Sequence, residues 1–288
     1  MLRTCFWTVA ILVGALCLGD APAEPPPATA PALFPVTVMD LQVSDNGGDT
    51  GYIDVQGNMR IPPQFRYGEE FHEGLAVVSL GHPPDQRFGY VDASGKLIGE
   101  INWRVVWEFS EGLGLVCGDG KFGYIDRTGA VAIPFQYDTA FPFREGLARV
   151  EVVPGPGTGA RWGFIDHAGK WVIPPQFEFV MDMSEGLASA TIGNKIGFID
   201  KTGKYVIPPQ FQRTEDFSEG LAAVRAGGKW GFIDRRGTFI VPPKYDSAVS
   251  FREGMAAVCV QEKWGFVDQH GAVVVAPKYD TAKSFSEG

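Results

Sequence analysis

Short apolar runs separated by turn residues dominate this sequence. Three such runs follow one another at Leu221–Val224, Lys229–Asp234 and Thr238–Val241. Their length and their β-branched and aromatic residues predict β-strands. The link Asp234–Gly237 joins the second run to the third, and Asp-x-x-Gly is typical of a type I turn followed by a glycine at positive φ. We expect Pro242-Pro243 to end the third strand, because proline cannot donate a hydrogen bond to a strand ladder.

The second of these strands is apolar or small on both faces. Trp230 and Phe232 point to one side, and Gly231 and Ile233 point to the other. Such a strand must be covered on both sides, and Gly231 leaves room for a ring or a backbone to lie close. One unit carries too few rings to fold alone, since each buried aromatic contributes roughly 2–3 kcal/mol against about 1–2 kcal/mol of backbone entropy per residue. Neighbouring units are therefore expected to stack.

The same pattern recurs along the chain at a period of 34 residues, interrupted by two insertions. An aromatic residue follows a key glycine, an Asp comes three residues after it, a second Gly comes six after it, and Glu-Gly closes the unit. The key glycines are Gly51, Gly89, Gly123, Gly163, Gly197, Gly231 and Gly265. Features present in every unit cannot mark one unique site. We therefore expect the repeated Asp and Glu to form turns and the repeated Trp to lie in the core.

These motifs resemble those of the WG-repeat family, also called KWG repeats. The resemblance rests on KWGFID at 229–234, IPPQF at 173–177 and 207–211, and FSEGLAAV at 217–224, and it covers about residues 41–288. Residues 99–103 depart from the pattern by replacing the Ile-Pro-Pro segment. The resemblance implies a β-rich repeat domain of the kind often found in bacterial envelope or secreted proteins, usually without a known activity.

The expected fold is an all-β domain of seven tandem antiparallel meanders of ~34 residues, the last one incomplete. Leu41–Val43 resembles a degenerate first strand, and the chain stops at Gly288, just before the equivalent strand would begin. A closed seven-bladed propeller-like ring, completed by the N-terminal strand, is one arrangement. The other is an open superhelical array. We favour the open array because the units are short for four-stranded blades.

The N-terminal segment has the features of a secretory signal peptide over residues 1–23. Arg3 precedes the apolar stretch Phe6–Gly19, and Ala21-Pro22-Ala23 has the form of a cleavage site before Glu24. Lipidation of Cys17 is the alternative, but Leu16 stands where a small residue is wanted. Residues 24–40 are expected to form a Pro/Ala-rich linker. The features predict a secreted, periplasmic or cell-envelope protein without a stable membrane span after cleavage.

Charge and composition argue against several classes of function. The net charge is −9 and basic residues are interspersed with acidic ones, so we expect no nucleic-acid partner. No pair of histidines has metal-ligand spacing, and no Ser/His/Asp or Cys/His set can be assembled. We therefore expect no metal, no cofactor and no enzymatic activity. Cys117 and Cys259 lie at the same repeat position four units apart, which is too far for a disulfide in an open array.

Function is expected where the units differ from one another. The insertions Leu80–Gln86 and Val153–Ala160 extend one hairpin loop each, and extra length in a repeat protein often marks a binding face. The candidate contact residues are Trp103, Trp107, Trp171, His82, Asp85, Pro154 and Pro156. Plainer interpretations stay open: tolerated surface insertions, and Trp103 filling the usual aromatic position. We predict a scaffold that binds protein partners, and the alternative is a carbohydrate- or peptidoglycan-binding module that uses the exposed aromatics.

Overall fold

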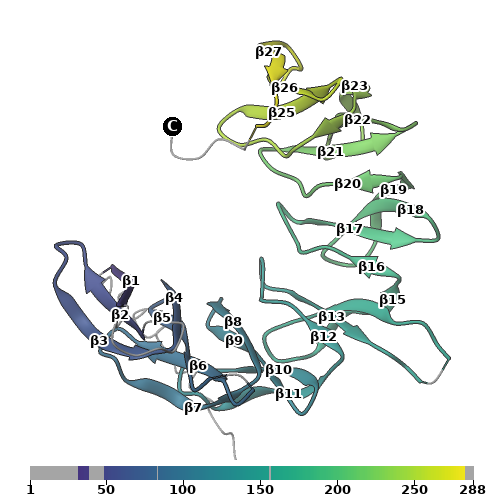
Figure 1. Cartoon of the computed structure of the whole chain (residues 1–288). Helices are drawn as coiled ribbons and strands as arrows, with labels where there is room; N and C mark the ends of the chain where they lie inside the picture. Colours follow the sequence, from purple (N-terminus) through teal and green to yellow (C-terminus); the bar gives the residue numbers. More distant parts are fainter. Residues whose placement is uncertain (1–31, 39–48, 83, 156, 283–288) are drawn as a thin grey trace, which may run out of the picture. The chain divides into compact units, whose positions relative to one another are not determined.

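The computed structural model describes residues 32–38, 49–82, 84–155 and 157–282, and every regular element in these ranges is a β-strand (Figure 1). The described residues all belong to one compact unit, Ala32–Gly288. The predicted signal peptide lies outside the described residues, as does the strand expected at Leu41–Val43. The described ranges contain no helix long and apolar enough to cross a membrane.

Seven antiparallel sheets follow one another along the chain, and each is a meander with its strands in sequence order. Sheet 1 consists of β1 (Leu33–Val38), β2 (Asp49–Asp54) and β3 (Met59–Phe65). Sheet 2 consists of β4 (Tyr67–His72), β5 (Leu75–Leu80), β6 (Arg87–Asp92) and β7 (Leu97–Trp103). Sheet 3 consists of β8 (Val105–Ser110), β9 (Leu113–Gly118), β10 (Lys121–Ile125) and β11 (Val131–Tyr137).

The remaining sheets have a very short first strand. Sheet 4 consists of β12 (Thr139–Ala140), β13 (Ala148–Val152), β14 (Arg161–Ile165) and β15 (Trp171–Phe177). Sheet 5 consists of β16 (Phe179–Val180), β17 (Leu187–Ile192), β18 (Lys195–Asp200) and β19 (Tyr205–Phe211). Sheet 6 consists of β20 (Arg213–Thr214), β21 (Leu221–Ala226), β22 (Lys229–Asp234) and β23 (Phe239–Tyr245). Sheet 7 consists of β24 (Ser247–Ala248), β25 (Met255–Val260), β26 (Lys263–Asp268) and β27 (Val273–Tyr279).

The structure confirms the all-β fold of tandem meanders and corrects the number of strands in a unit. Sheets 2 to 7 have four strands rather than the expected three. In sheet 7 the additional strand is only Ser247–Ala248, which pairs with Val258 and Cys259 of β25. Two residues are too few to produce an alternating pattern, so this strand left no signal in the sequence.

The first strand also corrects the expected boundary between linker and repeat domain. Residues 24–40 were expected to form a linker, but β1 (Leu33–Val38) lies within them and pairs along its whole length with β2. Val36 pairs with Gly51 as Val224 pairs with Gly231. The sequence separation is much larger in sheet 1, and the regular spacing therefore gave no signal for β1.

The Trp-Gly motif of β22 and the Pro-Pro motif of β23 pack directly against each other. Trp230 pairs with Tyr245 and Phe232 pairs with Val241, so the residues between Val241 and Tyr245 bulge over Gly231. A Cβ on Gly231 would lie 2.8 Å from Pro243 N and 2.9 Å from the Pro242 carbonyl carbon. The expectation that the prolines end the strand is therefore wrong. They lie inside β23, an edge strand of its sheet, where a missing amide proton is tolerated.

The Asp-x-x-Gly links are the predicted hairpin turns. In sheet 6, Gly237 has φ of 84° and its amide donates to the Asp234 carbonyl at 2.9 Å. The Asp234 carboxylate accepts hydrogen bonds from the amides of Arg236 at 2.9 Å and Thr238 at 2.8 Å. The Thr238 amide is the largest cause that holds the pKa of Asp234 below its ordinary value. The side chain thus replaces hydrogen bonds that the strands cannot supply at the turn.

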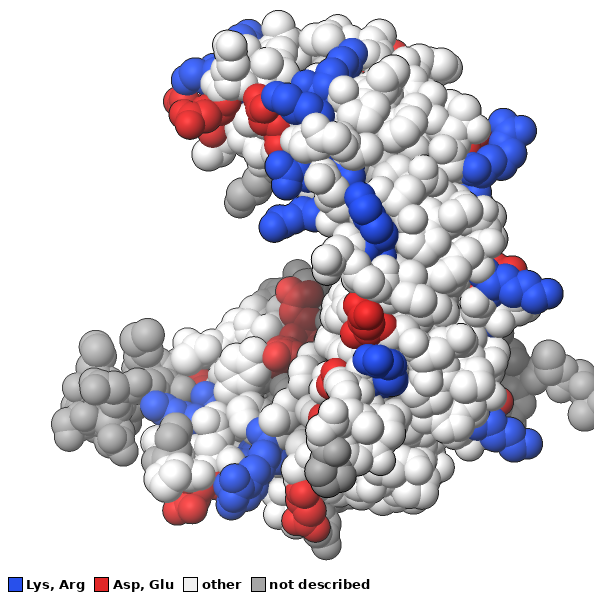
Figure 2. All heavy atoms as spheres, turned by 90° about the vertical axis from the view of Figure 1, so that its right-hand side faces the viewer, with Lys and Arg blue, Asp and Glu red and all other residues white. Residues whose placement is uncertain are grey.

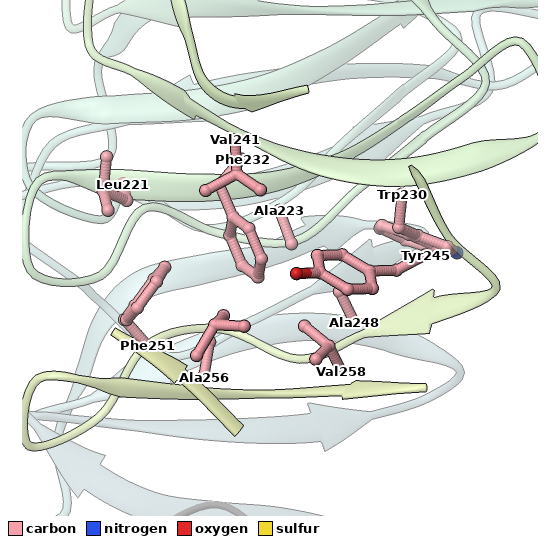
Figure 3. Close-up of a cluster of buried hydrophobic side chains, with 11 residues drawn as sticks. Leu221, Ala223, Trp230, Phe232, Val241, Tyr245, Ala248, Phe251, Ala256 and Val258 are labelled. Carbon is pink, nitrogen blue, oxygen red and sulfur yellow. The ribbon is translucent and has the colours of Figure 1, made fainter. Parts of the chain in front are cut away.

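Hydrophobic clusters join each sheet to the next. In the cluster of Figure 3, Trp230 and Phe232 of sheet 6 pack against residues of sheet 7 that include Phe251. Phe232 and Phe251 meet edge to face with ring centroids 4.8 Å apart. Ile233, on the other face of β22, belongs to the cluster shared with sheet 5. Each cluster is shared by consecutive sheets, which agrees with the open array.

The repeated Glu of the Glu-Gly turn binds the next sheet as well as forming its own turn. Glu219 has φ of 55°, in the left-handed region that residues other than Gly, Asn and Asp rarely adopt. Its carboxylate accepts a hydrogen bond from the Gly254 amide at 2.9 Å and another from Gln269 Nε2 at 2.9 Å. Equivalent bonds run from Glu73 to Gly112, Glu111 to Gly146, Glu145 to Gly186 and Glu185 to Gly220. We call this series the glutamate ladder.

Candidate functional site

Each four-stranded sheet has two ends with different chemistry. The Glu-Gly and Asp-x-x-Gly turns lie at one end, which we call the turn end. The hairpin loop between the second and third strands lies at the other, which we call the loop end. Both insertions are at loop ends, since residues 80–86 join β5 to β6 and residues 153–160 join β13 to β14.

The predicted contact residues of the insertions lie on the surface. His82, Asp85 and Pro154 are exposed, and the Asp85 amide donates to the His82 carbonyl at 2.8 Å in a tight turn. Pro156 lies outside the described residues. The structure therefore keeps the two loops as exposed features but brings none of these side chains into a shared pocket.

The three predicted tryptophans have different surroundings. Trp103 pairs with Phe88 as Tyr245 pairs with Trp230, so it occupies the usual aromatic position of the repeat. Trp107 is half-buried against the core shared by sheets 3 and 4, with its ring 5.8 Å from that of Phe122. Trp171 is 39% exposed at the start of β15.

A cavity of about 770 Å³ opens at the loop end between sheets 2 and 3. Its walls are residues 102–105 and 117–121, with Arg87 and Phe135. The indole of Trp103 lies beside the Phe135 ring, with centroids 5.3 Å apart. Both rings are half-buried, so each leaves part of its surface in the cavity. This volume is in the range that holds small ligands.

The cavity lacks an ion pair that other loop ends have. The Lys two residues before the key glycine pairs with the Asp that follows the last strand in Lys121–Asp138 at 2.6 Å, Lys229–Asp246 at 2.5 Å and Lys263–Asp280 at 2.5 Å. The lysine in each pair lowers the pKa of its aspartate. In sheet 2 the equivalent residues are Arg87 and Arg104, two cations. Both line the cavity.

Sequence reasoning pointed to Trp103 but missed the arginines. Comparison of the repeats position by position could have found them, because Arg104 stands where Asp138, Asp246 and Asp280 stand in other units. Cys117, at the expected repeat position, is also part of the cavity wall, while Cys259 is buried; both are free thiols.

A second surface feature is a row of apolar side chains at the outer edge of the last four sheets. The second residue of each outer strand is exposed: Val172 at 41%, Val206 at 44%, Ile240 at 41% and Val274 at 55%. The residue before each one is aromatic or apolar: Trp171, Tyr205, Phe239 and Val273. Consecutive strand residues point to opposite faces, so the four exposed second residues, Val172, Val206, Ile240 and Val274, share one face and form what we call the outer-edge row. Trp171 and Tyr205 pack edge-on against aromatic rings of the preceding sheet, Tyr137 and Phe177, with centroids 5.9 Å apart in both pairs.

Charges on the described surface are dispersed. Figure 2 shows basic and acidic groups separated by wide uncharged areas on the face it presents. In the described part of the chain, no three His, Cys, Asp or Glu side chains gather as metal ligands would.

The fold defines an all-β repeat protein with apolar and aromatic side chains exposed at the edges of its sheets. The family model of the WG containing repeat matches at residues 51–81, 88–122, 122–152, 162–195, 196–230, 230–264 and 264–288. These matches cover most of the chain, and the protein belongs to the WG-repeat family. A search of curated proteins found no match.

Solved structures resemble the fold at low sequence identity. A crystal structure of a eukaryotic initiation factor has a TM-score of 0.54 at 10% identity, over 76% of this chain and 68% of that one. Hsv2 from Kluyveromyces lactis has a TM-score of 0.47 at 9% identity, over 81% and 93%. The extracellular domain of a putative one-component system from B. thetaiotaomicron has a TM-score of 0.39 at 12% identity, over 78% and 36%. The neighbours are β-propeller-like, and the likeness concerns the fold alone.

Proposed function

We propose that this protein is a non-enzymatic scaffold that binds a protein partner along its outer-edge row. The observation that supports this most is the exposure of Val172, Val206, Ile240 and Val274 at one repeated position of consecutive sheets. Exposed apolar side chains that recur at the same position of consecutive sheets lower solubility, and such surfaces often mark sites of interaction with other proteins. A row of rigid β-branched side chains suits a protein partner with an apolar surface of its own.

The prolines of the outer strands favour binding through side chains. Pro208-Pro209 and Pro242-Pro243 lie in the edge strands β19 and β23. Proline lacks the amide proton that an added strand would need, and it is one of the devices that prevent strands from pairing edge to edge. A partner is therefore expected to contact the row with side chains instead of adding a strand.

The same proposal places the protein outside the cytoplasm, because residues 1–23 have the features of a signal peptide. Mass spectrometry of the protein from the organism that encodes it tests this part. The mature N-terminus is expected near Glu24, and an intact Met1 or a lipidated Cys17 would contradict the location.

Photo-crosslinking tests the binding role. A photoreactive amino acid is introduced at Val206 or Ile240, and at the control position Val55, which is 64% exposed in a turn outside the row. The first two positions are expected to crosslink the same partner, and Val55 to give none of it. The identified partner, once purified, is then expected to bind the Ile240→Glu variant at least about tenfold more weakly, since a buried unpaired charge costs more than 1.4 kcal/mol. Equal binding by both proteins would reject the outer-edge row as the site.

A further inference from the structure

The cavity between sheets 2 and 3 has a positive charge that its own acids do not balance. Arg87 donates from Nη1 to the Gln86 carbonyl at 2.9 Å, a contact that leaves its charge uncompensated. Among the described side chains, neither Arg87 nor Arg104 forms an ion pair. Lys121 in the same wall is paired with Asp138, and Asp119 contributes one negative charge. Two guanidinium groups are thus available to an anionic ligand.

Sheet 2 alone carries a cation at both of these repeat positions. Where sheets 3, 6 and 7 close this end with a Lys–Asp pair, sheet 2 places Arg104 at the position of the acid. A pair of like charges destabilises the free protein slightly and becomes favourable when an anion lies between them. Guanidinium groups also match the planar geometry of a carboxylate, which they can bind with two parallel hydrogen bonds.

The aromatic wall supplies a second kind of contact. Trp103 is held beside Phe135 and is half-buried, so the indole can present a surface with little loss of entropy. Aromatic rings next to cations and polar groups suit a ring that has an apolar face and polar edges. Sugars have this character, and a cavity of about 770 Å³ is large enough for more than one sugar ring.

We propose that this cavity binds an acidic sugar, with the sugar ring on Trp103 and the carboxylate between Arg87 and Arg104. This site is independent of the outer-edge row, because it lies at the loop end of sheets 2 and 3. Nucleic acid is a poor fit, since it requires an extended basic surface and the chain carries a net charge of −9.

Calorimetric titration with three probes tests the proposal: trigalacturonic acid, sialyllactose and the disaccharide of N-acetylglucosamine and N-acetylmuramic acid. Each is compared with its carboxyl-reduced counterpart. At least one acid is expected to bind, and its reduced form to bind at least about tenfold more weakly, as loss of a charge-assisted contact predicts. The proposal fails if none of the acids binds with a Kd below about 1 mM, or if the acid and its reduced form bind equally.

Arg104→Asp is the decisive variant, because it restores the acid that other units carry and should fold. It is expected to abolish binding of the acid, while Lys229→Ala in sheet 6 leaves binding unchanged. If Arg104→Asp has a much lower melting temperature than the wild type, Arg87→Gln is tested in its place. Unchanged affinity in both arginine variants would overturn the site.

Alkylation of the cysteines supplies a readout of position. Bound acid is expected to slow the modification of Cys117 in the cavity wall, but not that of Cys259, measured on separate peptides by mass spectrometry. Protection of neither thiol or of both equally would place the ligand elsewhere. The Ile240→Glu variant should retain sugar binding, so failure of this proposal and failure of the outer-edge row are distinguishable.

Discussion

Gly231 lies under the bulge of the neighbouring strand, where an added methyl group has no room. We expect Gly231→Ala to lower the free energy of unfolding by about 2–4 kcal/mol, because the Pro242-Pro243 backbone would have to move. Denaturant unfolding followed by circular dichroism measures the change. Gly155→Ala is the control: a Cβ there meets nothing within 4 Å, and the stability is expected to stay within about 0.5 kcal/mol. Equal effects of the two substitutions would show that the tight fit is not what requires glycine.

Tyr245 has a buried hydroxyl that lacks a hydrogen-bond partner among the described residues. Figure 3 shows its oxygen pointing into the cluster of apolar side chains. Other units have Phe at this position, such as Phe177 and Phe211. Tyr245→Phe is therefore expected to raise the free energy of unfolding by about 1 kcal/mol, because it removes an unsatisfied polar group.

The matched control for Tyr245 is Tyr124. Its hydroxyl donates to the Phe141 carbonyl at 2.8 Å, so it ties sheet 3 to sheet 4. Tyr124→Phe is expected to lower stability by about 1 kcal/mol in the same chemical denaturation assay. The two substitutions remove the same atom and should change stability in opposite directions. A loss of stability in both would mean that the Tyr245 hydroxyl is satisfied in solution.

At the scale of the element, the glutamate ladder explains why Glu occupies a position with positive φ. Glu219→Ala removes the acceptor for the Gly254 amide and for Gln269. We expect a loss of about 1 kcal/mol and faster hydrogen exchange at Gly254, in the turn of the next sheet. Glu262→Ala is the control, since Glu262 also has positive φ (61°) but lies in the hairpin between β25 and β26. Exchange at Gly254 that does not differ between the two variants would reject the interaction between sheets.

The strands that could be predicted are those whose residues repeat at fixed spacing. β21 and β22 stood out because their apolar runs and turn residues recur in every unit. β24 could not be found, because two paired residues leave no pattern. The sequence predicts that the third strand ends at its prolines, whereas β23 continues beyond them. Only the register shows that the chain bulges over Gly231 and then pairs again at Tyr245. Local sequence gives the strands, while the fit between strands depends on residues that are distant in the chain.

The candidate site was predictable only in part for the same reason. Trp103 stood out as an aromatic residue in an atypical segment, and the structure places it in a cavity wall. Arg87 and Arg104 are separated by a strand pair in the sequence, and each is unremarkable alone. The Lys121–Asp138 ion pair of the next sheet shows that these two repeat positions face each other, and only this contact indicates that Arg87 and Arg104 lie close together.

For the molecule as a whole, a chain of charges links three consecutive sheets. Arg149 of β13 is buried, with its guanidinium 3.4 Å from the centroid of the Phe141 ring, and its Nε donates to Asp182 at 2.6 Å. Asp216 is the next acid in the series. Burial raises its pKa to about 6, the charges of Asp182 and Glu215 add to the rise, and Arg149 opposes it.

This raised pKa predicts how the stability of the domain changes with pH. The folded state binds the Asp216 proton more tightly than the unfolded state, so this group favours folding at low pH. Its contribution is lost as the pH rises through about 6, where the carboxyl ionises in the folded protein. Asp216→Asn cannot ionise, and it is expected to raise the melting temperature above that of the wild type by roughly 3 °C at pH 7.5 and to have little effect at pH 3.5, below the pKa of the unfolded group.

Asp246→Asn is the control with the opposite sign. Lys229 lowers the pKa of Asp246, so this ion pair stabilises the folded state near neutral pH and is lost as the pH falls below about 4. The variant is expected to melt at a lower temperature than the wild type at pH 7.5, and the difference should shrink at pH 3.5. Calorimetric melting across this range separates the two aspartates, because one variant gains on the wild type as the pH rises while the other falls behind it. If the melting temperatures of the two variants changed with pH in the same way, Asp216 would not be an acid whose charged form destabilises the folded state.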